Sequence, residues 1–306
     1  MEVLKVQKLS KKFKNVSAVR DVSFSLREGE ILGFLGPNGA GKTTTIQMLL
    51  GVLLPTQGEI FYFGKSFARH REEILEYINF SSTYTNLPWD LTVRENFTFI
   101  SYLYDIDDRR KRLADVVRIF RLQKLWNEKI HSLSAGQLTR VNLAKAFINF
   151  PKVLLLDEPT ASLDPDIAQY IREFLLEERK KFQVSVVLTS HNMSEVEAVC
   201  DRVIFINKGR IIADDTPRNL TRSIQVCHVE LLFAPKFVDR IEVFARTKKI
   251  RMRREGRYFI FDVPEKTLPS FLKSLNDAGL TYDEISIDKP NLEDYFLRTI
   301  SSSKKI

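Results

Sequence analysis

The chain has 306 residues, of which 44% are hydrophobic and 28% are charged, with a formal net charge of +8. This balance excludes a disordered, fibrous or disulfide-framed protein, and the length allows two domains. The two cysteines, Cys200 and Cys227, are far apart and lack metal-ligand spacing. No apolar run reaches the roughly 18 residues that a membrane span needs. The first residues lack the apolar core of a signal peptide, so we expect a cytoplasmic protein.

The excess of positive charge suggests two classes of binding partner, nucleic acid and anionic lipid. The basic residues are spread along the chain, with local runs at 109–112 and 248–254. Such runs are most often solvated faces, and a weak attraction to a membrane surface is the other interpretation. We expect no nucleic-acid partner.

The first strands precede a glycine-rich turn. Residues 2–9 and 18–26 alternate apolar with polar side chains, which predicts half-buried strands separated by a Lys-rich turn around 11–15. Residues 30–35 predict an apolar strand. A glycine-rich turn follows it, and a helical pattern continues from 44 to 50.

The next stretch is largely helical. Residues 58–64 predict a short strand bounded by glycines. A capping box at Thr92 then opens one helix, and further amphipathic helices cover about 108–121 and 137–149. We interpret 85–150 as a helical insert.

After Pro151 the signature of a parallel sheet returns. Residues 153–156 are a continuous apolar run, too short for a helix and typical of a strand buried on both faces. We expect a helix from Pro165 to about 181, a second buried strand at 184–188 and a hairpin over 202–214. This alternation of strands and helices predicts an α/β core.

The character of the chain changes around 217–225. Residues 226–298 predict, in order, strand, helix, strand, strand, helix and strand, followed by a terminal helix from Asn291. That order is compatible with a ferredoxin-like module of its own. We therefore divide the chain into a first domain, 1–220, and a small accessory α+β domain, 221–306.

The turn after residues 30–35 has the spacing G-x-x-x-x-G-K-[ST] of a phosphate-binding loop. Its glycines let backbone N–H groups face phosphate oxygens, and the helix that follows favours negative charge at its N-terminus. Lys42 supplies a positive charge for the β- and γ-phosphates, and the Thr43 hydroxyl suits magnesium. The predicted nucleotide-binding residues are Gly36, Pro37, Asn38, Gly39, Ala40, Gly41, Lys42, Thr43 and Thr44.

Polar residues also follow two of the predicted buried strands, at the edge where ligands of open α/β sheets gather. Asp157 can hold magnesium through a water molecule, and Glu158 can orient or deprotonate an attacking water. His191 ends the neighbouring strand, where it can reach a γ-phosphate. The predicted catalytic residues are thus Glu158, His191 and Lys42.

Residues 133–137 precede a helix and read Leu-Ser-Ala-Gly-Gln. Ser134 as the cap and Gln137 at the third helical position form a capping box. The amides and small residues at this helix start form an anion site. By itself the pentapeptide is weak evidence, because many helices begin in this way.

In order and spacing, these motifs resemble the ATP-binding subunit of an ABC (ATP-binding cassette) transporter over about residues 2–215. Residues 36–44 are similar to the Walker A motif, 153–158 to Walker B and 133–137 to the family signature, while His191 is similar to the switch histidine. The resemblance implies a P-loop NTPase cassette with a mixed sheet and a helical subdomain. It also implies ATP and magnesium as cofactors.

The resemblance further implies partners. Two copies would pair head to tail, so that the signature of one copy, Ser134, Ala135, Gly136 and Gln137, closes over ATP held by the other. Ser162, Leu163 and Asp164 match the dimer-contact loop, and Phe13 falls where the family stacks an aromatic ring on adenine. A separate transmembrane permease subunit would be driven by this closure. The chain would then lie peripherally on the cytoplasmic face of the inner membrane.

The sequence departs from the family pattern at two positions. Ala135 stands where glycine is commoner, a small change that we expect to be tolerated. The glutamine that the family places after the strand at 77–80 is missing, and Thr83 lies near its position. We hypothesise that a hydroxyl of Ser82 or Thr83 takes over its contact with magnesium.

The C-terminal module, which ends in Asn-Leu-Glu-Asp-Tyr-Phe-Leu at 291–297, resembles the extension of exporter-type ATPases of the drug and lipid-export group. The expected function is therefore ATP-driven export through a separate membrane subunit. Two alternatives stay open. One is a regulatory ATPase that acts on nucleic acid or ribosomes, suggested only by the basic charge. The other is a catalytically weak ATP-binding partner in a heterodimer, suggested by the missing glutamine.

Overall fold

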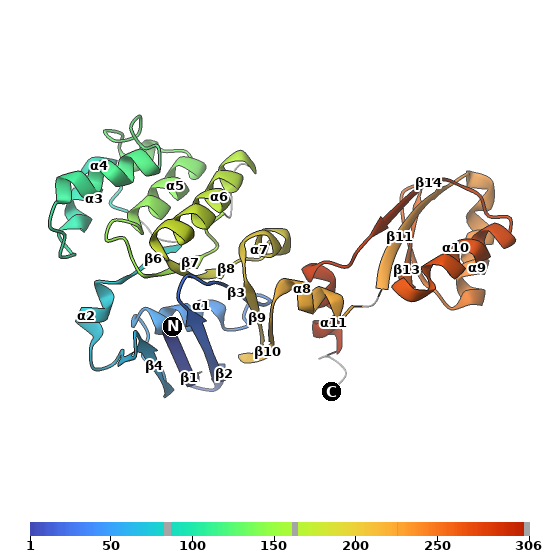
Figure 1. The fold of residues 1–306 in the computed structure, drawn as a ribbon, viewed down its shortest axis with the longest axis horizontal. Helices are drawn as coiled ribbons and strands as arrows, with labels where there is room; N and C mark the ends of the chain where they lie inside the picture. The colour runs from blue at the N-terminus through green and yellow to red at the C-terminus, as the bar shows by residue number, and fades with distance from the viewer. Residues whose placement is uncertain (83–86, 161–164, 225, 303–306) are drawn as a thin grey trace. The chain divides into compact units, whose positions relative to one another are not determined.

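The computed structural model describes residues 1–82, 87–160, 165–224 and 226–302 (Figure 1). The chain forms two compact units, Met1–Pro217 and Arg218–Ile306, and the described strands form two sheets in the first and one in the second. Because the short helix α8 (Pro217–Arg222) lies at the junction, we keep 1–220 and 221–306 as the proposed domains. None of the helices in the described ranges combines the length and the apolar character that a membrane span requires.

The N-terminal unit contains a four-stranded antiparallel sheet in the order β2-β1-β4-β5. The predicted turn around 11–15 is wrong in extent, because the hairpin ladder continues to the pair Phe13 and Val16. Bulges allow this extension, and Lys8 and Asp21 adopt left-handed φ angles of 49° and 53° within the two strands. The strands are β1 (Glu2–Phe13), β2 (Val16–Arg27), β4 (Gln57–Tyr62) and β5 (Lys65–Ser66).

A six-stranded sheet in the order β10-β9-β3-β8-β7-β6 carries the motifs. Five of its strands run parallel, and β10 pairs antiparallel with β9, so the predicted mixed sheet is confirmed. All residues of β3, β7 and β8 are buried, as their aliphatic runs predict. The strands are β3 (Ile31–Leu35), β6 (Ile78–Ser82), β7 (Val153–Asp157), β8 (Ser185–Thr189), β9 (Arg202–Asn207) and β10 (Arg210–Asp215).

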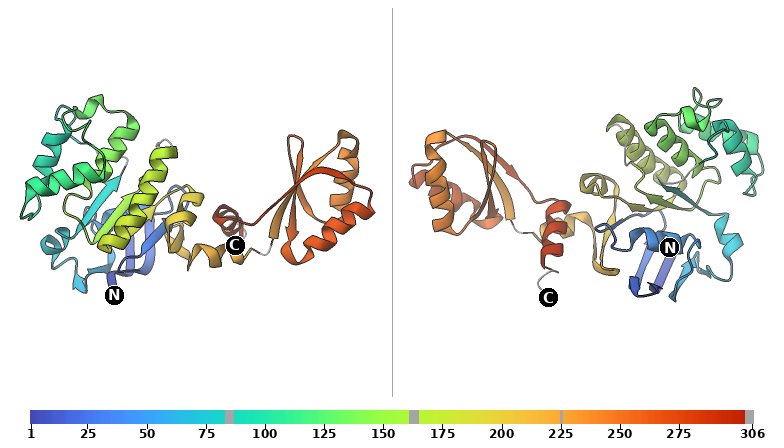
Figure 2. Two further views of the ribbon diagram at one scale, coloured as in Figure 1. Left: turned by 45° about the horizontal axis from the view of Figure 1, so that its top comes forward. Right: turned by 180° about the vertical axis from the view of Figure 1, so that it is seen from behind.

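The helices of this unit begin where the sequence places caps. Capping boxes are present at Thr92 and at Ser134, as predicted. Figures 1 and 2 show α3, α4 and α5 grouped at one end of the unit, away from the antiparallel sheet. The helices are α1 (Lys42–Leu49), α2 (Arg71–Leu75), α3 (Val93–Ser101), α4 (Arg109–Ile119), the 3-10 turn η1 (Ile130–Ser132), α5 (Ala135–Lys145), α6 (Pro165–Phe182) and α7 (Met193–Val199).

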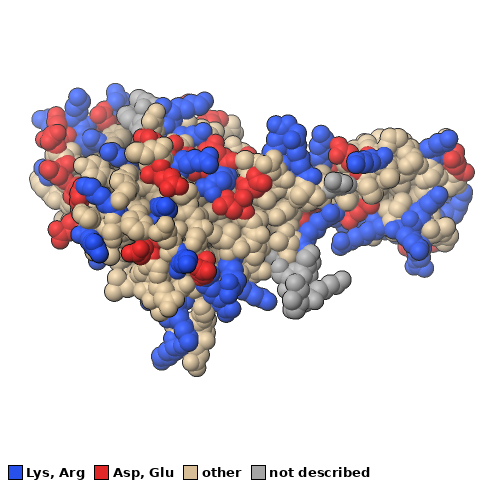
Figure 3. All heavy atoms as spheres, turned by 60° about the horizontal axis from the view of Figure 1, so that its bottom comes forward, with Lys and Arg blue, Asp and Glu red and all other residues tan. Residues whose placement is uncertain are grey.

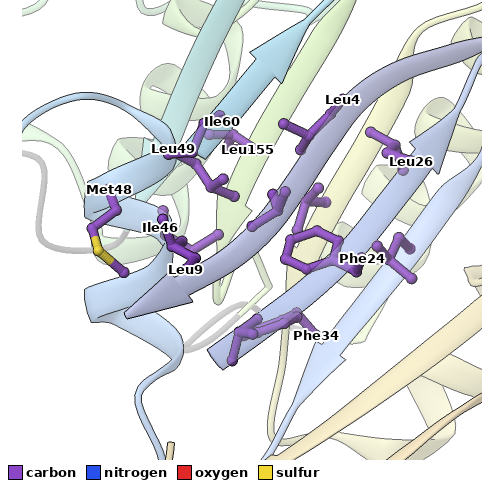
Figure 4. Close-up of a cluster of buried hydrophobic side chains, with 14 of the residues drawn as sticks. Leu4, Leu9, Phe24, Leu26, Phe34, Ile46, Met48, Leu49, Ile60 and Leu155 are labelled. Carbon is purple, nitrogen blue, oxygen red and sulfur yellow. The ribbon is translucent and has the colours of Figure 1, made fainter. Parts of the chain in front are cut away.

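The main core of the N-terminal unit joins its two sheets through helix α1 (Figure 4). Ile46 and Leu49 of α1 are buried with Leu9 of β1 and Leu155 of β7. Burial of large aliphatic side chains contributes about 1.5 to 3 kcal/mol each. The helix that follows the phosphate-binding loop is therefore held firmly on both sides.

The C-terminal unit has a four-stranded sheet in the order β12-β13-β11-β14, antiparallel throughout. This order confirms the predicted ferredoxin-like arrangement. Val229, Phe261, Phe271 and Leu275 are among the side chains that form its own core. Its elements are β11 (Val226–Phe233), η2 (Pro235–Phe237), α9 (Val238–Lys248), β12 (Arg251–Glu255), β13 (Tyr258–Pro264), η3 (Glu265–Thr267), α10 (Leu268–Asp277), β14 (Tyr282–Asp288) and α11 (Leu292–Ser302).

Candidate active site

The phosphate-binding loop, residues 36–41, joins the end of β3 to the start of α1. Gly41 has a φ of 107°, and a Cβ atom there would lie 2.5 Å from the carbonyl oxygen of Ala18. At Gly36 a Cβ atom would lie 2.2 Å from the carbonyl oxygen of Ile206. The loop therefore requires glycine at both positions, because its backbone passes directly against neighbouring strands.

Lys42 folds back over this loop. Its Nζ donates hydrogen bonds to the carbonyl oxygens of Gly36 at 2.6 Å and Pro37 at 3.4 Å. Burial lowers the pKa of the Lys42 ammonium, and the carboxylates of Glu158 and Asp157 partly offset that shift. The lysine and the two acidic residues therefore act on one another electrostatically, although they are far apart in the sequence.

Asp157 ends β7 and is buried. The hydroxyl of Thr189, at the end of β8, donates to Oδ1 of Asp157 at 2.5 Å. Within the described ranges, Oδ2 of Asp157 receives no hydrogen bond. The same ranges contain no cluster of three or more His, Cys, Asp or Glu side chains that could hold a metal ion by themselves. Magnesium needs only one or two protein oxygens when phosphates and water complete its shell. Asp157 and the exposed Thr43 thus fit such an ion when a nucleotide is bound.

Glu158 and His191 form a hydrogen-bonded pair across the ends of β7 and β8. Nδ1 of His191 lies 2.7 Å from Oε2 of Glu158, and the backbone N–H of His191 donates to the same oxygen at 3.3 Å. The backbone N–H of Glu158 donates to Oγ1 and the carbonyl oxygen of Thr189 at 3.2 and 3.1 Å. Glu158 adopts a left-handed φ of 55°, a costly conformation that often marks functional sites.

The pentapeptide 133–137 lies at the start of α5. The Ser134 hydroxyl accepts from the Gln137 N–H at 3.3 Å, and Oε1 of Gln137 accepts from the Ser134 N–H at 2.9 Å. Ser134 and Ala135 are exposed. Over the described parts of the chain, no hydrogen bond or ion pair joins this segment to the phosphate-binding loop. Within one copy, these two predicted sites are therefore not in hydrogen-bond contact in the described residues.

Phe13 lies at the end of β1 and its side chain is 45% exposed. The ammonium of Lys11 lies 5.2 Å from the centre of its ring. The aromatic ring of Phe13 is accessible for stacking on a planar base, as the sequence prediction requires.

One face of the N-terminal unit shows lysine and arginine interspersed with acidic residues (Figure 3).

Not every predicted site residue lies in the described ranges. Thr83, Ser162, Leu163 and Asp164 lie outside the described residues. Conversely, Thr189 contacts both Asp157 and Glu158 and carries no predicted role. The only sequence signal for Thr189 is its position at the end of a buried strand, two residues before His191.

Comparisons with known proteins agree with this geometry. The family model described as "ABC transporter" matches residues 19–161. The Nod factor export ATP-binding protein I of Burkholderia pseudomallei is 34% identical over 298 residues, covering 95% of both chains. The bacitracin transport ATP-binding protein BcrA of Bacillus licheniformis is 29% identical, covering 97% of both chains.

Solved structures give the same result. An ATP-binding subunit of an ABC transporter, 27% identical, aligns with a TM-score of 0.67 over 72% of this chain and 92% of its own. A dimeric ATP-binding cassette in a post-hydrolysis state, bound to ADP and Pi, is 25% identical, with a TM-score of 0.64 over 70% of this chain and 98% of its own. The chain therefore belongs to the ABC transporter family, as an ATP-binding subunit that hydrolyses ATP.

Proposed function

We propose that this chain is the ATPase subunit of an exporter and drives a separate transmembrane permease. The observation that carries the catalytic part is the Glu158 to His191 hydrogen bond at the sheet edge, within electrostatic reach of Lys42. The relatives named for Nod factor export and bacitracin transport, matched over nearly their whole length, support the export part. The hydrogen-bonded pair argues against the alternative of a catalytically weak partner.

In the proposed mechanism, residues 36–44 hold the phosphates and Phe13 stacks on the adenine. Glu158 orients the attacking water and accepts its proton, while His191 contacts the γ-phosphate. Lys42 offsets the negative charge that develops during phosphoryl transfer. Thr43 and Asp157 would hold magnesium, which supplies further charge neutralisation when bound.

The proposed active assembly is a head-to-tail homodimer. The exposed start of α5, with Ser134, Ala135, Gly136 and Gln137, would close over ATP held by the other copy. The amides at a helix N-terminus favour an anion such as a γ-phosphate. Ser162, Leu163 and Asp164 keep their proposed role as the dimer-contact loop, and Thr83 keeps its proposed role near magnesium.

The proposed permease contact is on the helical subdomain. Several large apolar side chains are exposed on and beside α3, and apolar surface of this kind marks protein contacts. We propose that the membrane subunit covers these side chains, and that the chain lies peripherally on the cytoplasmic face of the inner membrane. The exposed residues are Trp89, Leu91, Phe99, Tyr102 and Leu103.

The test is co-purification with a membrane protein encoded beside the gene for this chain. Phe99→Glu with Tyr102→Glu should abolish the association and leave the ATPase activity of the isolated chain within about twofold, because neither residue touches the candidate active site. Val52→Glu, at an exposed aliphatic residue elsewhere in the same unit, is the control. An ATPase activity that depends on nucleic acid and a chain that captures no permease would contradict the proposal.

A further inference from the structure

Glu195 is a buried carboxylate with no role in the mechanism described so far. It lies on α7 and only 3% of its surface is exposed. Across residues 1–82, 87–160, 165–224 and 226–302, no lysine or arginine forms an ion pair with it. A buried charge without a cation is costly unless hydrogen bonds satisfy it. The donors that satisfy Glu195 are therefore informative.

Those donors flank the Glu158 and His191 pair. The Thr160 hydroxyl lies 2.6 Å from both carboxylate oxygens of Glu195, and the Ser190 hydroxyl donates to Oε2 at 3.1 Å. Thr160 follows Glu158 by two residues, and Ser190 directly precedes His191. One carboxylate thus ties together the two segments that leave β7 and β8.

The orientation of the Ser190 donor is fixed. Its hydroxyl oxygen accepts a hydrogen bond from the backbone N–H of Asn192 at 3.0 Å, which leaves its proton directed to Glu195. Ser190 is itself buried. The hydrogen bond between Ser190 and Glu195 is therefore shielded from water. Hydrogen bonds in such a buried environment are stronger than in water.

We propose that Glu195 is a positioning residue for ATP hydrolysis, which holds the segments after β7 and β8 at the separation where Glu158 and His191 meet. The inference rests on the proposed roles of these two residues. Without Glu195, both segments lose their common anchor, and small displacements of a catalytic group lower kcat strongly. ATP binding is retained, because the phosphate-binding loop lies on β3 and α1.

The test compares three variants of the purified chain. Glu195→Ala should lower kcat for ATP hydrolysis about tenfold with KM for ATP within about twofold. Glu195→Gln should recover to within about threefold of the original kcat, because an amide oxygen at the position of Oε2 still accepts from both Thr160 and Ser190. Glu197→Ala, at an exposed position of the same helix, is the control and should keep normal activity. Thermal unfolding separates these effects from loss of structure.

A folded Glu195→Ala variant with normal kcat overturns the proposal, as does a Glu195→Gln variant that loses as much as Glu195→Ala. Should Glu195→Ala not fold, Ser190→Ala carries the test: a loss of about threefold in kcat supports the proposal, and a normal kcat overturns it. Glu158→Gln is measured in parallel. Normal turnover there refutes the proposed site itself, whereas its loss beside a normal Glu195→Ala refutes only the positioning role.

Discussion

Within the described parts of the chain, His191 and His228 each contact a carboxylate, and they differ in what surrounds them. His191 meets Glu158 at 2.7 Å, and its side chain is 74% exposed. His228 meets Asp262 at 2.9 Å and Asp294 at 3.0 Å, and its side chain is only 13% exposed. The first pair lies at the carboxyl ends of the parallel strands β7 and β8, and the second is largely buried in the C-terminal unit.

The number of partners explains the difference. Both ring nitrogens of His228 face a carboxylate, Nδ1 that of Asp262 and Nε2 that of Asp294. Asp294 belongs to α11 and Asp262 to β13, so His228 fastens the last helix to the sheet. In the described ranges no residue hydrogen-bonds to Nε2 of His191. Histidine and carboxylate side chains thus form an accessible site in the N-terminal unit and a largely buried structural cluster in the C-terminal unit. We call this cluster, His228 with Asp262 and Asp294, the His228 clasp.

The substitution with the largest expected effect removes the carboxylate of the accessible pair of Glu158 and His191. Glu158→Gln should lower kcat for ATP hydrolysis about a thousandfold, because the amide cannot accept a proton from water. Binding of ATP should be unchanged within about threefold, since the phosphate-binding loop is intact. Single-turnover hydrolysis and a nucleotide-binding titration check this, and a variant with normal turnover would refute the assigned role.

Removing the histidine of the same pair should have the next largest effect. His191→Ala should lower kcat about 30-fold through loss of the γ-phosphate contact. Because the side chain is largely exposed, the free energy of unfolding should change by less than about 0.5 kcal/mol. A large loss of stability with normal kcat would show that His191 is structural, as His228 is.

Substitution in the His228 clasp should have the opposite pattern of effects, lowering stability and leaving catalysis unchanged. His228→Phe should lower the free energy of unfolding of the C-terminal unit by about 2 kcal/mol, because Asp262 and Asp294 then lack a shared donor. ATP hydrolysis should stay within about twofold of normal, since the catalytic residues lie in the other unit. Denaturant unfolding gives the first value, with the exposed His70→Phe as control. An unchanged unfolding curve would contradict the clasp.

Lys145 is a third case to compare with the two histidines, because its ammonium group has no carboxylate partner in the described residues. Burial lowers the pKa of its ammonium to about 8. The folded state therefore binds fewer protons than the unfolded state between about pH 8 and pH 10.5, so the stability from this group increases as pH rises through that window. Lys145→Met should add about 1 kcal/mol at pH 7 and less at pH 10. Thermal unfolding at both pH values checks this, and equal gains would be inconsistent with the shift.

The sequence predicts most of the site because its chemistry follows directly from strong local patterns. Gly36 to Thr44 have a fixed spacing, and Asp157 and His191 end or follow buried aliphatic runs that are recognisable as strands. Parallel strands bring such ends to one edge. Thr189 and Glu195 could not be predicted, because their roles come from hydrogen bonds between residues more than 30 positions apart.

The fold was predicted to a similar degree. The strand order of the C-terminal unit follows from its element order, whereas the clasp between His228 and Asp294 joins residues 66 positions apart that carry no motif. The hairpin of β1 and β2 is longer than predicted, since bulges break the strict alternation on which the prediction depends. Local patterns thus gave the elements, and tertiary contacts decided their ends.

The central claim is that ATP is held between the phosphate-binding loop of one copy and the Ser134 helix start of another. Cysteines introduced as Asn38→Cys and Ser134→Cys in the Glu158→Gln background test this directly, because both positions are exposed and the native Cys200 and Cys227 are buried. We predict a disulfide between residues 38 and 134 of different copies that forms with ATP and magnesium and not without nucleotide. A chain that stays monomeric with ATP, or that forms the same disulfide within one copy, would contradict the account.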